Sequence, residues 1–235
     1  MSTDNRIKPL RGYSVGIIPD GNRRWARQNN RRLDEAYWLA MKKLAVVVDG
    51  LLRLGAASVA IYALSRDNLE RPRGDLAAVC RAEERFLREL LPTVKRAHRA
   101  TAFHAGRADL LPAAYREALG NVCDPSRRRR DSVPSVFICA AYDPCDEVTA
   151  CWRRNAQQRE DVVASLWVPR TIDLVIRTGG DCRLSGFLPL QCKYAEFFFE
   201  PYYFPDINQR RVRGIVRQFL KRKRRFGKGG TPTDA

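Results

Sequence analysis

The chain has 235 residues, a length that fits one domain with a substantial hydrophobic core. Lysine and arginine number 43 against 26 aspartates and glutamates, so the formal net charge is +17 and polyanionic partners are expected: phosphorylated substrates, an acidic membrane surface or nucleic acid. The seven cysteines include no Cys-x-x-Cys pair and only two histidines are present, which argues against a zinc knuckle and indicates free thiols in a reducing compartment.

Hydropathy and charge distribution narrow the possible partners. No apolar stretch reaches the roughly 18 residues of a membrane span, and the segment Met1–Arg11 is polar, so we expect a cytoplasmic protein with at most peripheral membrane contact. Two basic runs, Arg127–Arg130 and Lys221–Arg225, hold much of the charge. Neither run is interleaved with the aromatic side chains on which single-stranded nucleic acids stack, so we interpret both as solubilising surface and predict no nucleic-acid partner.

The hydrophobic pattern predicts strands alternating with helices. The first half begins with a strand at 13–18, a helix from residue 25, a helix at 35–54 ending at Gly55, a strand at 58–64 and a long helix at 75–98. Strands then follow at 101–104, 136–141, 172–176 and 197–199, with helices at 110–122, 147–159 and 207–224. This alternation predicts a single α/β domain with a mostly parallel central sheet of about six strands flanked by helices. We place a flexible lead-in at residues 1–12, the domain at 13–226 and a disordered tail at 227–235.

The stretch Gly16–Arg27 joins an apolar strand to a helix through a Pro-Asp-Gly-Asn turn and carries three arginines. A glycine turn that opens a helix directs backbone N–H groups at one point, where a phosphate can bind. Asp20 would repel a bare phosphate, but Mg²⁺ held by this carboxylate and by diphosphate oxygens removes that repulsion. Taken alone, the pattern is also typical of an ordinary turn followed by a solvated arginine face.

A second stretch, Arg177–Phe187, also follows an apolar strand and combines glycines, a carboxylate, a hydroxyl group and two arginines. Two such turns at strand ends indicate two phosphorylated substrates. In this order and at this separation, both stretches resemble the cis-prenyltransferase family, which includes undecaprenyl diphosphate synthase. The resemblance runs from about Tyr13 to Gly227, and its further motifs are Leu64–Pro72, Tyr194–Phe199, Pro205–Asp206 and Arg224–Gly227.

The resemblance implies the family fold with an apolar tunnel, and an enzyme that condenses small isoprenoid diphosphates with loss of pyrophosphate. The substrates would be dimethylallyl, isopentenyl or geranyl diphosphate. The cofactor would be Mg²⁺, and the enzyme would form a homodimer. It assigns Mg²⁺ to Asp20 and Glu196, and catalytic roles to Asp20, Ser65 and Asn68. The implied substrate-binding residues are Gly21, Asn22, Arg23, Arg24, Trp25, Tyr37, Arg71, Arg177, Arg183 and Ser185. We expect the tunnel to be lined by Tyr62, Leu64, Leu69, Phe86 and Leu90, although aromatic and leucine side chains at helical spacing more often form part of the hydrophobic core.

The chain departs from the family after the first motif. Leu33 replaces an arginine, and Glu35–Ala40 replaces the family's Phe-Gly-His-Lys-Ala-Gly segment, so one basic phosphate ligand and one histidine are absent. Tyr142–Cys145 replaces the family's Tyr-Gly-Gly-Arg motif. The changes at Leu33-Asp34 and at Tyr37 are similar to those of lavandulyl-type members, which join two units head to middle. We therefore predict a short-chain product for secondary metabolism and leave a branched and a regular cis product equally open.

Other functions also remain open. A regular cis-polyprenyl diphosphate synthase would share every motif above. A non-catalytic accessory subunit of the family would tend to lack the first carboxylate, and because both Asp20 and Arg24 are present we favour an enzyme. A basic nucleic-acid-binding protein would show steeply salt-dependent RNA binding.

Overall fold

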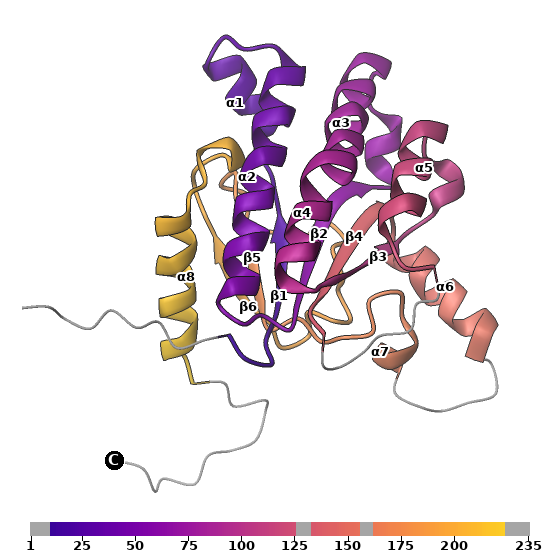
Figure 1. The fold of residues 1–235 in the computed structure, drawn as a ribbon, viewed down its shortest axis with the longest axis vertical. Helices are drawn as coiled ribbons and strands as arrows, with labels where there is room; N and C mark the ends of the chain where they lie inside the picture. Colours follow the sequence, from indigo (N-terminus) through magenta and orange to yellow (C-terminus); the bar gives the residue numbers. More distant parts are fainter. Residues whose placement is uncertain (1–9, 126–132, 156–161, 224–235) are drawn as a thin grey trace, which may run out of the picture.

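The computed structural model describes residues 10–125, 133–155 and 162–223 (Figure 1). In that part of the chain six strands form one sheet in the order β3-β4-β2-β1-β5-β6, and every neighbouring pair is parallel. The strands are β1 (Ser14–Ile18), β2 (Ser58–Ser65), β3 (Thr101–Ala105), β4 (Ser135–Tyr142), β5 (Leu174–Arg177) and β6 (Glu196–Phe199). The prediction of one α/β domain with about six mostly parallel strands is confirmed.

Helices connect the strands, as a parallel sheet requires. They are α1 (Asn22–Gln28), α2 (Leu33–Arg53), α3 (Arg73–Arg85), α4 (Leu91–His98), α5 (Ala113–Val122), α6 (Pro144–Asn155), α7 (Val162–Ser165) and α8 (Gln209–Lys221). Short 3₁₀ turns lie at Asp67–Glu70, Ala108–Leu110 and Phe204–Asp206. In Figure 1 the helices α2, α3 and α4 cover one face of the sheet.

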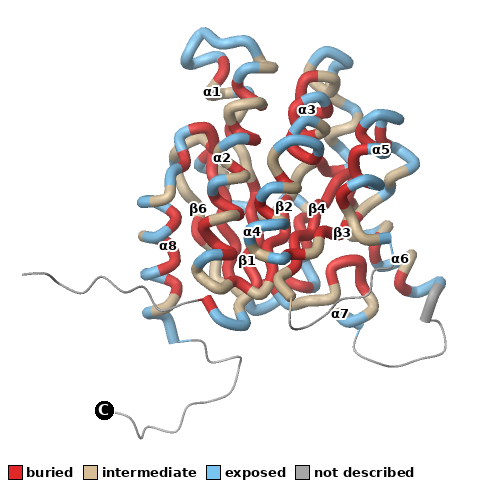
Figure 2. Tube along the Cα trace, viewed as in Figure 1, coloured by how far each residue is buried: buried red, intermediate tan, exposed pale blue. Residues whose placement is uncertain are grey.

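The sheet is buried on both faces, which explains its apolar strands. Side chains alternate between two clusters along each strand. The cluster under the helices contains Ile17, Ile61, Ile138 and Ile176, and the opposite cluster contains Ala60, Phe137 and Val175. On that opposite face Trp167, Phe187 and Leu188 cover the strands. Figure 2 shows this buried layer between more exposed outer surfaces.

Two sequence predictions about the elements need correction. The continuous helix predicted at 75–98 is interrupted by a π-helical turn, Phe86–Leu90, between α3 and α4. Pro92 lies in the first turn of α4, where its missing N–H and its ring disrupt the regular helical hydrogen bonds. Leu10, which falls in the predicted lead-in, is fully buried in the core. The predicted tail and the run Arg127–Arg130 lie outside the described residues.

No helix in the described ranges has both the length and the apolar character needed to cross a membrane.

Candidate active site

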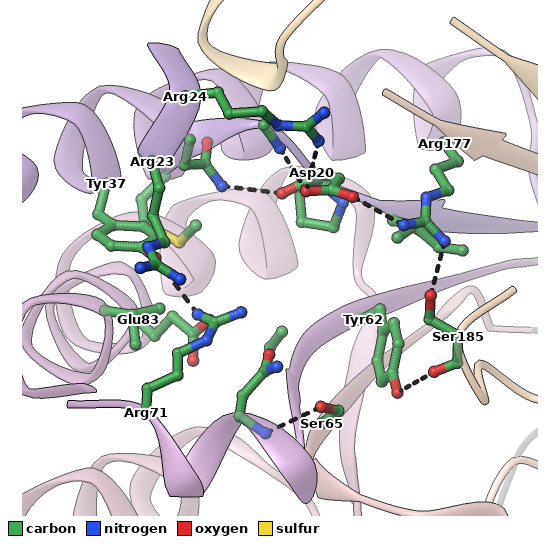
Figure 3. Close-up of a pocket in the computed structure, with 18 of the residues that line it drawn as sticks. Asp20, Arg23, Arg24, Tyr37, Tyr62, Ser65, Arg71, Glu83, Arg177 and Ser185 are labelled. Atoms are coloured by element: carbon green, nitrogen blue, oxygen red, sulfur yellow. Dashed lines mark hydrogen bonds and ion pairs between the residues drawn. The ribbon is translucent and has the colours of Figure 1, made fainter. Parts of the chain in front are cut away.

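A pocket of about 430 Å³ lies at the carboxyl ends of β1, β2 and β5 (Figure 3). These ends meet at one edge of a parallel sheet, where α/β proteins commonly bind ligands. The predicted site residues that line it are Asp20, Gly21, Asn22, Arg23, Arg24, Tyr37, Ser65, Asn68, Arg71, Arg177 and Ser185. Residues from the two anion-binding motifs and from the loop after β2 therefore share one pocket.

Arg177 holds the centre of the site together. Its side chain is only 4% exposed, and its Nη2 atom donates to Asp20 Oδ2 at 2.8 Å. Its Nη1 atom donates to Ser185 Oγ at 2.9 Å and to the backbone carbonyl of Arg183. Thr178 ties the same turns together, since its hydroxyl donates to the Asp20 carbonyl at 2.8 Å and accepts from the Asp20 amide at 3.1 Å. This role of Thr178 was not predicted.

Asp181, the carboxylate of the second motif, has a place in the site that was not predicted. It accepts hydrogen bonds or ion pairs from Arg24 at 2.9 Å and from Arg183 at 2.9 Å, and it lies 3.9 Å from Arg177. Partial burial raises the pKa of Asp181, but the guanidinium charges of Arg183 and Arg24 outweigh this and hold that pKa below its usual range. Its position between the glycines and Arg183 in the second motif is the signal that would have identified it.

Two glycines let the motifs pack closely. Gly179 has φ +94°, and a Cβ atom there would lie 2.8 Å from Arg24 Nη2 and 3.2 Å from the backbone carbon of Asp20. Gly21 has φ +95°, and a Cβ atom there would lie 2.4 Å from Cδ1 of Tyr203. Both positions combine a left-handed backbone with a neighbour too close for a side chain.

The donor set fits a diphosphate that carries a metal ion. Arg177 Nε is a buried donor and Asn22 Oδ1 a buried acceptor, and neither has a hydrogen-bond partner within the described residues. Asp20 offers a carboxylate that is 32% exposed. No group of three or more histidine, cysteine or acidic side chains in the described ranges could hold a metal ion alone. Mg²⁺ is commonly held by one or two carboxylates together with substrate phosphates, which is the arrangement that Asp20 can support.

Three predicted site residues do not line the pocket. Arg183 lies outside it, 65% exposed, and pairs with Asp181. Trp25 donates from Nε1 to Asp206 Oδ1 at 2.9 Å. Glu196 starts β6 opposite Leu174, three residues before Arg177, so it lies roughly 10 Å along the sheet from the strand ends. There it accepts from Arg222 at 2.6 Å, and the structure does not bring it to Asp20 within one chain.

The loop after β2 places polar groups opposite the anion-binding turns. Ser65 Oγ accepts from the Asn68 amide at 3.1 Å, which fixes the start of the 3₁₀ turn. Arg71 Nη1 donates to Tyr37 Oη at 3.3 Å. Burial raises the pKa of Tyr37, so this phenol stays neutral at physiological pH. Tyr37 thus fills space near Arg71 where the family pattern has other residues.

The inner end of the pocket is short and largely apolar. Met41 and Val79 line its wall, and behind them lies a void of only about 10 Å³ that is closed by Phe86, Leu87 and Tyr115. Of the predicted tunnel residues, Tyr62 lines the pocket and Phe86 lines this void. Leu64 is buried in the core cluster, and Leu69 and Leu90 pack against that cluster.

One buried carboxylate stands in this apolar wall. Glu83 is 3% exposed and lines both the pocket and the inner void. Tyr115 Oη donates to Glu83 Oε2 at 2.6 Å. Burial raises the pKa of Glu83 to about 7, although the Tyr115 hydrogen bond and the Arg71 charge act in the opposite direction. Glu83 falls on the apolar stripe of α3, four residues after Val79, and this spacing could have identified it from sequence.

Comparison with known proteins identifies the family of the chain. The family model described as "Putative undecaprenyl diphosphate synthase" matches residues 18–227. A tritrans,polycis-undecaprenyl-diphosphate synthase (geranylgeranyl-diphosphate specific) of Pyrococcus horikoshii is 32% identical over 228 residues, which covers 91% of this chain and 86% of the relative. An isoprenyl transferase of Campylobacter jejuni is 27% identical over 219 residues, covering 91% and 97%.

Solved structures of other proteins share the fold of this chain. The crystal structure of lavandulyl diphosphate synthase from Lavandula x intermedia in complex with dimethylallyl diphosphate superposes with a TM-score of 0.83 at 24% identity, covering 94% of this chain and 99% of the other. A probable undecaprenyl diphosphate synthase from Campylobacter jejuni has a TM-score of 0.70 at 25% identity, covering 92% and 98%. The chain therefore belongs to the undecaprenyl diphosphate synthase family of cis-prenyltransferases, enzymes that transfer prenyl groups.

Proposed function

We propose that this enzyme condenses two small isoprenoid diphosphates, with loss of pyrophosphate, to a short-chain prenyl diphosphate for secondary metabolism. The observation that carries the proposal is the shape of the pocket: a rim of arginines and carboxylates leads to an apolar end that Phe86, Leu87 and Tyr115 close. A growing chain of many isoprene units would need to displace these side chains. Dimethylallyl, isopentenyl and geranyl diphosphate are the proposed substrates.

The first diphosphate would bind to the turn after β1, through Gly21, Asn22, Arg23 and Arg24. When Mg²⁺ is bound, it would be held by Asp20 and would neutralise charge that develops on the leaving pyrophosphate. Arg177 both orients Asp20 and offers a charged donor to the anion. No role at this site is assigned to Glu196 from the same chain.

The second diphosphate would bind beside the first, where Ser185 and Arg177 meet. Arg183, at the exposed rim, would reach it by leaving Asp181. Ser65, Asn68 and Arg71 would lie over the reacting carbons, orient the alkene and exclude water from a cationic centre. We also propose a homodimer, which light scattering of the purified protein would test.

A regular cis-polyprenyl diphosphate synthase is the second candidate, favoured by the 32% identity to a relative named tritrans,polycis-undecaprenyl-diphosphate synthase. The experiment that separates the two incubates the purified protein with Mg²⁺ and each pair of the three diphosphates, followed by mass spectrometry of the products. Products of two or three isoprene units would support the proposal. Polyprenols of many units would overturn the short-chain product, and no prenyl product from any pair would overturn the proposed reaction.

A further inference from the structure

Glu83 is a carboxylate among apolar side chains, and the binding of diphosphates does not explain why a carboxylate lies there. It lies with Tyr37 and Arg71 on the side of the pocket away from Arg177 (Figure 3). Its neighbours toward the inner end are Met41, Val79 and Phe86, which are apolar. One carboxylate oxygen, Oε2, is bonded to Tyr115, whereas Oε1 makes no hydrogen bond within the described residues. The carboxylate of a buried residue is thus only half paired within the protein, and it lines the space that a hydrocarbon would fill.

The interactions available to Oε1 of Glu83 depend on the ligand that fills the inner end of the pocket. Once a ligand fills the pocket and excludes water, an acceptor without a protein partner is unfavourable unless that ligand supplies a donor, a positive charge or a proton. A neutral isoprenoid tail supplies none of these. The same tail supplies both a positive charge and an acidic C–H group once it becomes a carbocation, so the free oxygen of Glu83 is matched to the cationic stage of a reaction.

We propose that Glu83 is the base that removes the last proton of a head-to-middle condensation. This inference rests on the proposed function and specifies its product as branched. The C1–O bond of the allylic donor breaks, and its electron pair leaves with pyrophosphate. The C2=C3 π electrons of the acceptor form the new C1–C2 bond, which leaves a tertiary cation at C3. A methyl C–H bond on C3 then breaks, its electrons form the new C=C bond, and the proton goes to Oε1 of Glu83.

The depth of Glu83 distinguishes this product from a regular one. In a regular condensation the proton is lost from C2, between the cation and the carbon that carries the acceptor's diphosphate, so its base lies near the anion-binding turns. In the head-to-middle reaction the proton is lost from a methyl group beyond C3, at the end of the acceptor away from its diphosphate. Glu83 lies at that end, across the pocket from Arg177.

The test compares Glu83→Gln with Glu84→Gln in purified enzyme supplied with Mg²⁺ and dimethylallyl diphosphate, alone and together with isopentenyl diphosphate. Glutamine keeps the shape and the Tyr115 hydrogen bond but cannot accept a proton. We expect Glu83→Gln to lower formation of the branched alkene at least about 100-fold, while its dissociation constant for inorganic pyrophosphate stays within threefold of wild type. Glu84, whose carboxylate pairs with Arg88 on the outer side of α3, is the matched control and should leave the rate unchanged.

The outcomes separate the two proposals. If wild type forms no prenyl product from any pair of the three diphosphates, the proposed function fails. If wild type forms a regular product, or if Glu83→Gln forms the branched product within threefold of the wild-type rate, the role of Glu83 fails and prenyl transfer stands. Loss of pyrophosphate binding in Glu83→Gln would assign Glu83 to the architecture of the pocket and would also overturn its role as a base.

If Glu83→Gln does not fold, a second measurement tests whether Glu83 acts as a base. The groups that face Glu83 are Arg71, Tyr37, Cys80 and Tyr115. Burial raises the pKa of Cys80 to about 12 and those of both tyrosines above their usual values, so neither the thiol nor the phenols titrate near neutrality. A base at Glu83 makes kcat fall below about pH 7. Tyr115→Phe removes a hydrogen bond that lowers the pKa of Glu83, so this acid limb should move to higher pH. An unmoved limb in folded Tyr115→Phe would overturn the proposal.

Discussion

The Arg177 guanidinium donates to the Asp20 carboxylate at 2.8 Å and joins the end of β5 to the end of β1. Arg177 is almost fully buried whereas Asp20 is open to the pocket, so the pair has one fixed member and one accessible member. The carboxylate is therefore oriented before any substrate arrives, which is the condition for electrostatic stabilisation of a leaving group.

Asp20→Asn tests this arrangement. The amide keeps the size of the side chain but removes the charge, so we expect turnover to fall at least about 100-fold. The free energy of unfolding should fall by about 1–3 kcal/mol, because the buried Arg177 loses its charged partner. Steady-state kinetics and urea unfolding would measure the two effects. Asp109→Asn is the control, since Asp109 pairs with Arg107 at an exposed site; an equal loss of turnover there would contradict the assignment.

Gly179→Ala should disturb the close packing between the turn after β5 and the turn after β1. The new Cβ atom would meet Arg24 Nη2 at 2.8 Å in a backbone conformation that costs a side chain about 1–2 kcal/mol. We expect weaker binding of pyrophosphate, by roughly tenfold for about one hydrogen bond lost, measured by calorimetry. Gly120→Ala in α5 meets no atom within 4 Å and should stabilise the helix by about 0.5–1 kcal/mol without affecting binding. Unchanged binding in Gly179→Ala would show that Arg24 does not contact the anion.

The sequence could predict the parallel sheet because its strands are short, continuously apolar runs separated by helical patterns. It could also predict that Asp20 and Arg177 lie at the same edge of the sheet, since each ends or follows a strand, but their contact depends on the pairing of β1 with β5, which only the structure shows. The placement of Glu196 follows from the same logic: it begins its strand instead of ending it, and parallel strands put beginnings and ends on opposite edges.

Other features depend on contacts between distant helices and could not be predicted. The environment of Glu83 requires Tyr115, which α5 brings from 32 residues away. Two of the residues that close the pocket, Phe86 and Leu87, lie in the π-helical turn Phe86–Leu90, which the sequence pattern did not predict. The helical periodicity of this segment predicts that Glu83, Phe86 and Leu87 are buried, but it does not predict which residues they contact.

Phe86→Ala should lengthen the product. Removing the ring enlarges the void behind the pocket, so a longer hydrocarbon can enter, and mass spectrometry should detect products with at least one more isoprene unit. The substitution should also cost about 3–5 kcal/mol of stability. Phe103→Ala is the matched control, because Phe103 is equally buried but stacks on Phe137 in the opposite cluster. It should destabilise the protein to a similar degree and leave the product unchanged. An unaltered product in Phe86→Ala would remove Phe86 from the closure of the pocket.

Glu83→Gln should change stability in a pH-dependent way that is independent of any assay of activity. The pKa of Glu83 is raised from its ordinary value of 4.5 to about 7 in the folded protein, so the folded state binds the proton more tightly than the unfolded state. Stability of the wild type therefore decreases as pH rises from about 4.5 to about 7. A neutral glutamine avoids this cost. We expect Glu83→Gln to be more stable than wild type by about 2–4 kcal/mol at alkaline pH, with most of the gain lost near pH 5. Urea unfolding of both proteins at the two pH values measures the difference, and parallel pH dependences would contradict a carboxylate that is buried in its charged form.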